Sequence, residues 1–306
     1  MAKTIKFNLI CDEKPIRTIE DLQENFSIED ILKYYRNGLL LRWLKVRGYD
    51  AEYKLVSNVE KKEDIEIVKE LIRIFDVESD EKKIEEGVYM LQFCEERQKY
   101  YEKYKEKQYK ESMIINHYKE KYKYLIKELI NNSDDIAKIK ANIAELMNNY
   151  RWAMNLSHRE IFIKLCVKEN FLAIMCLLMN EEARKYYLPM KIENDEGKTI
   201  IDTDINPDKK AMCSKIWQIL RKTSFKEKLG ENLRSFAGNT DGYWKDIESK
   251  GKKYMIIDMK YGNYVRSAGV QGGDLSSDDI ENKFVILNGI DYKSNSSREE
   301  LRYMEV

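Results

Sequence analysis

Proline and glycine are scarce through most of this sequence of 306 residues. Its three prolines are Pro15, Pro189 and Pro207, and ten of its thirteen glycines lie at or after Gly197. Proline breaks helices and glycine loosens them, so little interrupts helical structure over residues 16–188. The apolar residues there recur mostly at three- and four-residue spacing. This pattern predicts a long helical body, followed by a glycine-rich region of different character.

Cysteine and histidine are also rare, and neither occurs in a metal-binding pattern. The five cysteines lie scattered without C-x-x-C spacing, at Cys11, Cys94, Cys166, Cys176 and Cys213. Such a set predicts reduced thiols and not a disulfide framework or a zinc site. With only two histidines, a multi-histidine metal centre is excluded, and Walker, G-x-S-x-G and H-E-x-x-H motifs are absent. We therefore expect no bound metal and no cofactor.

An excess of one charge and long apolar runs are missing as well. Lysine plus arginine and aspartate plus glutamate balance at 54 each, which argues against a polybasic nucleic-acid coat or membrane anchor. No apolar run approaches the roughly 20 residues of a membrane-spanning helix. The N-terminal segment also lacks the apolar core of a signal peptide. These absences predict a cytoplasmic protein without a membrane partner.

The pattern of elements divides the chain into three predicted parts. Residues 1–60 combine an alternating strand with short capped helices, which is typical of a small α+β lobe. Residues 61–235 predict a helical body with one long helix over about 81–130. Residues 236–306 alternate strand-like segments with glycine- and serine-rich turns. The expected fold class is α+β and predominantly α-helical, a long-helix bundle closed by a small antiparallel β unit.

Capping residues predict where the later helices begin. Ser133 and Ser157 each precede an apolar stripe as expected N-caps, the second with Glu160 as its capping-box partner. The segment 161–187 is apolar around most of its circumference and is predicted to form the central core. Pro207 suits the first turn of a helix, because its missing N–H needs no partner there.

The segment Thr18–Glu52 has the sequence TIEDLQENFSIEDILKYYRNGLLLRWLKVRGYDAE. It resembles an adaptor-like N-terminal module found in otherwise unrelated bacterial effector and antiphage conflict-system proteins. The resemblance implies a lobe that brings proteins together and that contributes no catalytic residues. The alternative is an ordinary small α+β lobe.

Arg151 and His158 have the spacing R-x6-H. It resembles the signature of HEPN ribonucleases, in which an arginine and a histidine from helix ends meet at a dimer interface and cleave RNA. A histidine that titrates near neutral pH can move the proton of a 2′-hydroxyl, and an arginine can stabilise the phosphorane charge. Here Trp152 follows the arginine, where that family favours a polar residue. The alternative is a helix-terminal histidine beside a surface arginine.

Asp258 and Lys260 alternate along a predicted strand, and Asp246 lies twelve residues upstream beyond a turn. This arrangement resembles the PD-(D/E)xK nucleases, in which two acids on adjacent strands hold Mg²⁺ and a lysine assists the attacking water. Asp258 and Lys260 would point to the same face of the strand. The family places a substantial helix after this strand, whereas this sequence continues with turn-like residues. An accidental D-x-K triplet in a highly charged chain is the alternative.

The segment 97–128 carries ten basic, five acidic and seven tyrosine side chains. Such a helix can follow a phosphate backbone and stack on bases, so nucleic acid is one class of partner. A solvated helix with i,i+4 ion pairs is the simpler alternative. Tyrosine also suits a half-exposed helix that buries its rings against a protein. The residues expected to contact a partner are Trp43, Tyr101, Tyr104, Tyr118 and Tyr122.

Two functional hypotheses follow. The leading one is a non-enzymatic interaction or regulatory subunit, an accessory to a bacterial antiviral defence-type system. It would bind a protein or ribonucleoprotein partner, or a second copy of itself. The alternative is a nuclease, either HEPN-like and metal-independent or PD-(D/E)xK-like and metal-dependent. The helices with large apolar faces, together with the lack of convergent polar motifs, favour binding over catalysis.

Overall fold

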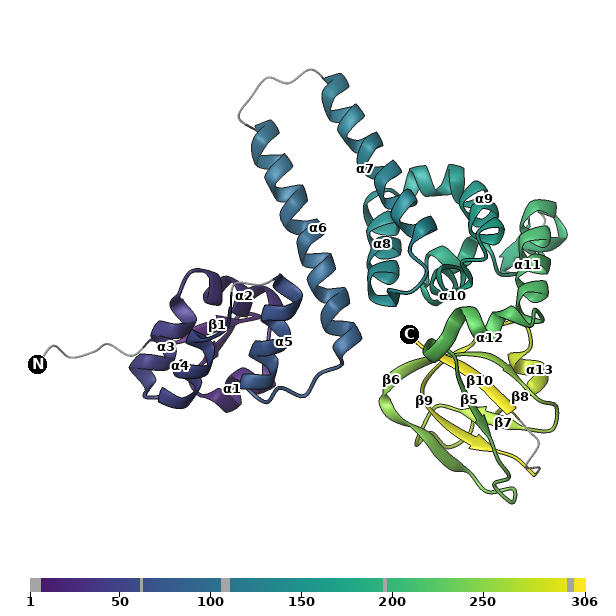
Figure 1. Ribbon diagram of the computed structural model, residues 1–306. Coiled ribbons are helices and arrows are strands. Elements are labelled where there is room, and N and C mark those ends of the chain that lie inside the picture. Colours follow the sequence, from purple (N-terminus) through teal and green to yellow (C-terminus); the bar gives the residue numbers. More distant parts are fainter. Residues whose placement is uncertain (1–6, 61–62, 106–110, 195–196, 296–299) are drawn as a thin grey trace, which may run out of the picture. The chain divides into compact units, whose positions relative to one another are not determined.

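The computed structural model describes residues 7–60, 63–105, 111–194, 197–295 and 300–306 (Figure 1). Two compact units make up the chain, Met1–Asn116 and His117–Val306. Helices predominate, and an antiparallel sheet ends the chain, so the predicted fold class is confirmed. The three-part division with boundaries after residues 60 and 235 stays a prediction. Among the described residues, no helix combines the length and hydropathy needed to cross a membrane.

The first unit is a small lobe of two short strands and several helices. Its elements are β1 (Leu9–Cys11), β2 (Lys14–Ile16), α1 (Ile19–Glu24), α2 (Ile28–Arg36), α3 (Leu39–Arg47), α4 (Asp50–Ser57), α5 (Asp64–Ile74) and α6 (Glu81–Lys105). The two strands form an antiparallel hairpin, and both turn residues, Asp12 and Glu13, adopt positive φ. The core between the helices encloses the fully buried side chains of Trp43, Leu22 and Leu71. This lobe matches the α+β character predicted for the N-terminal segment.

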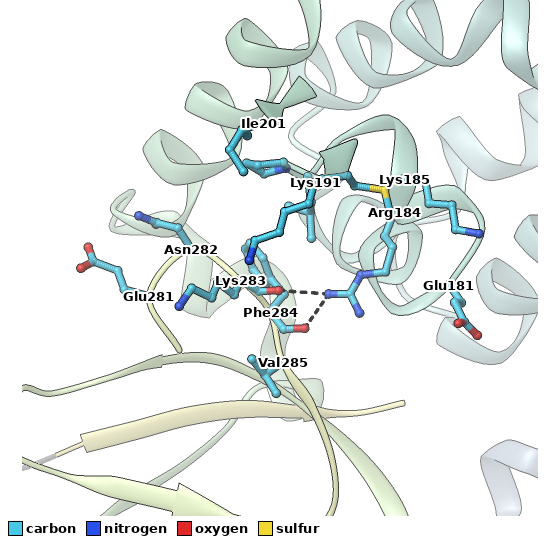
Figure 2. Close-up of a pocket in the computed structure, with 13 residues that line it drawn as sticks. Glu181, Arg184, Lys185, Lys191, Ile201, Glu281, Asn282, Lys283, Phe284 and Val285 are labelled. Atoms are coloured by element: carbon cyan, nitrogen blue, oxygen red, sulfur yellow. Dashed lines mark hydrogen bonds between the residues drawn. The ribbon is translucent and has the colours of Figure 1, made fainter. Parts of the chain in front are cut away.

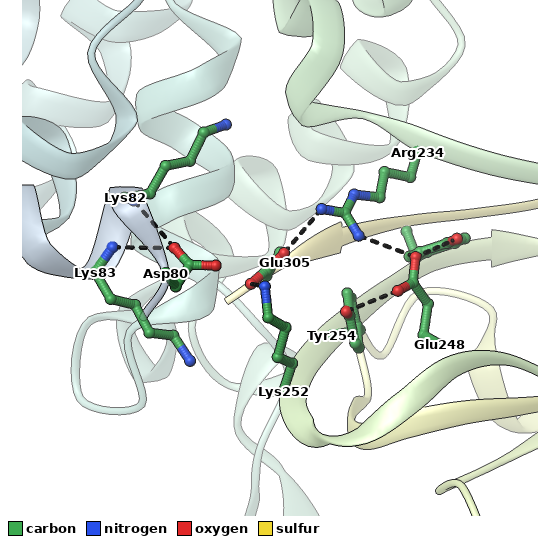
Figure 3. Close-up of polar contacts among 9 residues, drawn as sticks. Asp80, Lys82, Lys83, Arg234, Glu248, Lys252, Tyr254 and Glu305 are labelled. Carbon is green, nitrogen blue, oxygen red and sulfur yellow. Dashed lines mark hydrogen bonds and ion pairs between the residues drawn. The ribbon is translucent and has the colours of Figure 1, made fainter. Parts of the chain in front are cut away.

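Local capping chemistry sets the starts of helices in this unit. Thr18 and Asp21 form a capping box, each side chain accepting the other's backbone N–H at 3.1 Å. At the start of α6, the Asp80 carboxylate accepts the N–H groups of Lys82 and Lys83 at 3.0 and 3.1 Å (Figure 3). These bonds satisfy donors that the first turn of a helix leaves without a partner.

The structure describes two helices in the range where one long helix, 81–130, was predicted. These are α6 and α7 (Glu111–Asn131). Residues 106–110 lie outside the described residues, so the continuity predicted across them stays a prediction.

The second unit begins within α7, at His117, and continues through helices, a small hairpin and the sheet. Its helical elements are α8 (Ile136–Asn149), α9 (Arg151–Val167), α10 (Phe171–Met179), η1 (Ala183–Tyr186), η2 (Asp202–Asp204), α11 (Pro207–Leu220), α12 (Ser224–Leu229) and η3 (Gly230–Asn232). Every residue of α10 is buried, which confirms this part of the core predicted within 161–187, whereas Ile163 and Val167 of the same segment are exposed. Pro207 occupies the first turn of α11, as predicted. A two-stranded hairpin, β3 (Lys191–Glu193) and β4 (Thr199–Ile201), joins η1 to α11.

Two predicted helix starts are wrong. Asp135, not Ser133, caps α8, because the Asp135 carboxylate accepts the first-turn N–H at 2.9 Å. Ser157 lies in the middle of α9, where its hydroxyl donates to the Ala153 carbonyl at 2.8 Å. A serine can make this bond inside a helix as readily as it caps one, so the sequence signal is ambiguous. The break between the two helices falls at Tyr150 instead.

The C-terminal sheet has six antiparallel strands in the order β5-β10-β6-β9-β7-β8. Its elements are β5 (Arg234–Ala237), β6 (Lys245–Met259), β7 (Tyr264–Arg266), β8 (Leu275–Ser276), α13 (Ser277–Ile280), β9 (Ile286–Lys293) and β10 (Glu300–Glu305). The predicted antiparallel unit is therefore confirmed. Helix α12 links the sheet to the helical core, since Phe225 meets the ring of Phe171 and lies under the Arg302 guanidinium.

A half-buried carboxylate ties three neighbouring strands of the sheet together. Glu248 accepts hydrogen bonds from the hydroxyls of Tyr254 and Tyr303, each at 2.8 Å, and pairs with Arg234 at 3.0 Å (Figure 3). Arg234 also pairs with Glu305 at 2.9 Å. Burial by itself raises the pKa of Glu248, but these hydrogen bonds outweigh it and lower the pKa below its usual range. The carboxylate therefore stays ionised and holds β5, β6 and β10 in register.

Candidate functional site

Helix α9 exposes a row of large apolar side chains. Trp152 is 83% exposed, Leu156 88%, Ile163 50% and Val167 79%. Their spacing of four, seven and four residues keeps them on one side of a helix, and we name these four residues the α9 stripe. Several large apolar side chains exposed on one helix face are typical of interaction surfaces, whereas single ones are not informative.

A shallow apolar groove borders the α9 stripe. It encloses about 380 Å³ between α9 and α11 and is lined by Phe162, Ile163, Cys166, Ala211 and Met212, among others. Ile163 and Val167 belong to both the stripe and the groove. The apolar surface of α9 therefore extends onto the neighbouring helix.

The charged side chains next to the α9 stripe, and Arg159 on the same face between Leu156 and Ile163, are paired within the chain. Arg159 pairs with Asp208 at 2.5 Å, and Glu160 pairs with Lys164 at 2.6 Å. An apolar surface can approach this region without meeting an excess of either charge.

A second cavity, of about 710 Å³, lies in the same unit (Figure 2). We name it the cationic pocket. It is lined by residues between 181 and 191, by Ile201 of β4, and by residues 281–285 between α13 and β9. Arginine and lysine outnumber acids in this lining, and the rest of its wall is mostly apolar.

Arg184 lines the cationic pocket and is hydrogen-bonded to the opposite part of its lining. Its Nη2 donates to the carbonyls of Lys283 and Phe284 at 3.2 and 2.6 Å (Figure 2). Both Asn282 and Phe284 have positive φ, which is uncommon for residues other than glycine. Burial lowers the pKa of the Arg184 guanidinium, and nearby Glu181 opposes this effect.

The two residues of the predicted ribonuclease site lie two turns apart on α9. Seven residues of helix correspond to about 10 Å along its axis. Arg151 is exposed and pairs with Glu182 at 2.8 Å. His158 stacks on Tyr186 with ring centroids 4.5 Å apart. Both side chains thus already contact the segment around η1, where Glu182 and Tyr186 lie.

His158 sits in a cluster of aromatic and hydroxyl groups. Tyr187 packs its ring edge against the imidazole and donates its hydroxyl to the His158 carbonyl at 3.3 Å. The neighbouring Ser157 hydroxyl bonds that of Tyr122. Within the described part of the chain, Nδ1 of His158 is buried without a hydrogen-bond partner. Burial and the nearby Lys209 lower the pKa of His158, although Asp208 opposes them, so the ring is neutral near pH 7.

The predicted carboxylate site is dispersed. Asp246 and Asp258 lie near opposite ends of the single strand β6, not on adjacent strands. Asp258 accepts two hydrogen bonds from Arg302 of β10, one of them at 2.7 Å, and Lys260 directly follows the strand. Over the residues that the structure describes, no group of three or more histidine, cysteine, aspartate or glutamate side chains could hold a metal ion.

The residues predicted to contact a partner differ in exposure. Trp43 is fully buried in the first unit, so its side chain is a core residue and not a surface contact. Tyr101 is 60% exposed, and Tyr104 stacks on its neighbour Tyr100. Tyr118 instead contacts its own unit, because its ring meets Tyr150 and its hydroxyl bonds the end of α8. As noted above, Tyr122 is likewise engaged inside the second unit.

No protein-family model matches this sequence, and neither curated proteins nor solved structures contain a significantly similar chain. The interpretation of the candidate sites therefore follows from the chemistry of their own residues. The α9 stripe was not predicted from the sequence, because the helix break expected at Ser157 divides it. The 4-7-4 spacing of large apolar residues was the signal available. The cationic pocket had no local signal, since its walls come from segments about 100 residues apart.

Proposed function

We propose that this protein is a non-enzymatic interaction subunit that assembles through the α9 stripe, with a second copy of the chain as its partner. The observation that supports it most is the exposure of Trp152, Leu156 and Val167, each at 79% or more. Burying such side chains is favourable by about 1.5–3 kcal/mol each. A second copy would supply that burial.

The order of the stripe residues suits pairing with itself. The spacing of four, seven and four is the same in both directions, so two antiparallel α9 helices place Trp152 opposite Val167 and Leu156 opposite Ile163. Trp152 then faces the smaller Val167, and Leu156 faces Ile163, a side chain of equal size. A self-complementary surface of this kind is what a two-fold dimer requires.

The area available sets the expected strength of the dimer. From the exposed fractions, the four side chains present roughly 400–500 Å² of apolar surface per copy, allowing about 200 Å² for a tryptophan. Two copies would bury roughly 800–1,000 Å², below the standard interface of about 1,600 Å². The expected assembly is a weak dimer in the micromolar range, which a regulatory subunit can form and release.

Sedimentation velocity of the full chain between about 1 and 100 μM tests this proposal. Leu156→Glu removes one apolar contact per copy, about 3 kcal/mol for the pair, and should weaken the dimer about 100-fold. The matched control is Leu55→Glu, at a leucine of α4 that is 53% exposed and outside the α9 stripe. A chain that is monomeric at 100 μM, or a control that weakens the dimer equally, would refute the proposal.

The role as an accessory of a bacterial defence-type system is part of the same proposal. It is supported by the resemblance of Thr18–Glu52 to adaptor modules. Co-expression with the proteins encoded by adjacent genes, followed by purification of the wild type and the Leu156→Glu variant, separates this role from self-association. If the dimer forms but no neighbouring product co-purifies with either protein, the accessory role is wrong.

The nuclease alternative has weaker support. Arg151 is paired with Glu182, His158 is covered by Tyr186, and Asp258 is held by Arg302. Incubation with labelled RNA and DNA, with Mg²⁺ or with EDTA, tests it directly. Cleavage that survives EDTA and is lost in His158→Ala would favour the ribonuclease, whereas metal-dependent cleavage lost in Asp258→Ala would favour the carboxylate site.

A further inference from the structure

We propose that the cationic pocket binds a small amphipathic anion, that is, a carboxylate or phosphate group attached to an apolar body. Its volume of about 710 Å³ falls within the range of roughly 300–1,000 Å³ that is typical of ligand sites. The pocket is separate from the α9 stripe, so this inference does not depend on the proposed function.

In the part of the chain that the structure describes, no carboxylate forms an ion pair with the half-buried Arg184. Other arginines do pair with an acid, among them Arg36, Arg151, Arg159, Arg234, Arg266 and Arg302. Among the described residues, the guanidinium of Arg184 bonds only two neutral carbonyls, both through Nη2. Buried charges in proteins are normally paired, and a guanidinium has five N–H donors. Its other donors are available for an anion.

Lys191 supplies a second positive charge at the same place. Figure 2 shows its side chain extending from β3 toward the segment of Lys283 and Phe284, whose carbonyls also accept the hydrogen bonds of Arg184. The other two lysines of the lining have partners, since Lys283 donates to the Asp278 carbonyl and Lys185 pairs with Glu182. In the same view, the carboxylates of Glu181 and Glu281 point away from the space between Arg184 and Lys191. The centre of the pocket is therefore positive.

The rest of the wall suits an apolar body. Leu188, Pro189, Met190, Ile201 and Val285 line the cavity beside these two cations. Inorganic phosphate could pair with the two cations but would make no apolar contact with this wall. A neutral alkyl chain could pack against the wall but would leave the cations unpaired. A ligand that carries both parts matches the whole lining.

The anion-binding group is held in position before a ligand arrives. Arg184 is fixed by the Lys283 and Phe284 carbonyls, and the flanking residues Asn282 and Phe284 keep an uncommon backbone conformation. Backbone strain of this kind persists only where the surroundings maintain it. A preorganised donor loses little freedom on binding, which favours affinity.

Fluorescence titration of the full chain with 8-anilinonaphthalene-1-sulfonate, an anion with apolar rings, tests the proposal. Octanoate, octyl phosphate, octanol and inorganic phosphate are then added as competitors. We expect displacement by octanoate or octyl phosphate at concentrations at least tenfold lower than for octanol or inorganic phosphate. Whichever anion displaces the probe better identifies the head group.

Variants assign the binding to this pocket. Lys191→Glu should weaken displacement by the better anion at least tenfold, while the matched control Lys226→Glu, at an exposed lysine of α12, should leave it unchanged. Circular dichroism checks that both variants fold, and the Leu156→Glu background removes dye binding at the α9 stripe. The proposal is overturned if octanol competes as well as the anions, if neither anion competes, or if the two lysine variants behave alike.

Discussion

A buried ion pair at the start of α11 provides a sharp test of the structural reasoning. Lys209 is only 7% exposed in its side chain, and its ammonium pairs with Asp202 at 2.5 Å. The same ammonium donates to the Lys185 carbonyl at 2.6 Å, and Asp202 accepts the Met190 N–H at 2.9 Å. This small network joins α11 and η2 to Lys185 and Met190, which lie near the two ends of the segment between η1 and β3. That segment forms one wall of the cationic pocket.

Replacing Lys209 by methionine keeps most of the length of the side chain and removes its charge. The Asp202 carboxylate, 16% exposed in its side chain, then loses its cation. Removal of one member of a buried ion pair typically costs about 3–5 kcal/mol. Because Asp202 keeps the Met190 N–H and some solvent contact, we expect the lower end, a loss of about 3 kcal/mol in the free energy of unfolding. Adding Asp202→Asn should recover about 2 kcal/mol of this loss, since no unpaired charge is then buried.

The assay is urea unfolding followed by circular dichroism and by tryptophan fluorescence, because Trp217 lies on α11 and stacks on Phe284. The matched control is Lys210→Met, at the exposed lysine next in sequence, and it should change stability by less than about 0.5 kcal/mol. If Lys209→Met is as mild as this control, or if the double variant shows simple additivity, the ion pair does not stabilise the fold as described.

Three further predictions follow from other parts of the structure. Gly289→Ala should destabilise the protein by about 3 kcal/mol, because φ is +65° there and an added Cβ would lie 2.6 Å from that of Ala268; thermal unfolding measures it. Because the pKa of His158 is lowered in the folded protein, this histidine is protonated in the unfolded chain at a higher pH, near about 6.5, than in the folded one. The free energy of unfolding should therefore decrease between pH 7 and 5, and less steeply in His158→Phe. At pH 8, iodoacetamide should modify the exposed Cys94 at least tenfold faster than Cys166, whose pKa burial raises to about 11; peptide mass spectrometry measures both rates.

Each of these has a result that contradicts it. A Gly289→Ala variant as stable as the wild type would mean that the β9 backbone relaxes freely at this position. An unchanged pH slope in His158→Phe would assign the acid sensitivity to carboxylates. Equal labelling of the two cysteines would mean that the end of α9 is open to solvent.

Candidate sites were harder to predict from sequence than the elements that carry them. Arg151 and His158 have the spacing of a ribonuclease motif, but their neighbours Glu182 and Tyr186 come from a later segment. Trp43 suggested an exposed contact, and the structure buries it, because the short helices of the first unit close over α3. In both cases the residue type suggested a role, but the neighbours that decide the role come from segments distant in sequence.

Local chemistry alone determined much of this fold. The apolar run of α10, the proline in the first turn of α11, the Thr18–Asp21 box and the turns between strands all act within a few residues, so the sequence reveals them. Only the tertiary structure decided which face of α9 is covered and which is left as the α9 stripe, and it alone brought Arg184 to the carbonyls of Lys283 and Phe284. The reason is physical: capping and periodicity depend on neighbours along the chain, whereas burial and charge pairing depend on neighbours in space.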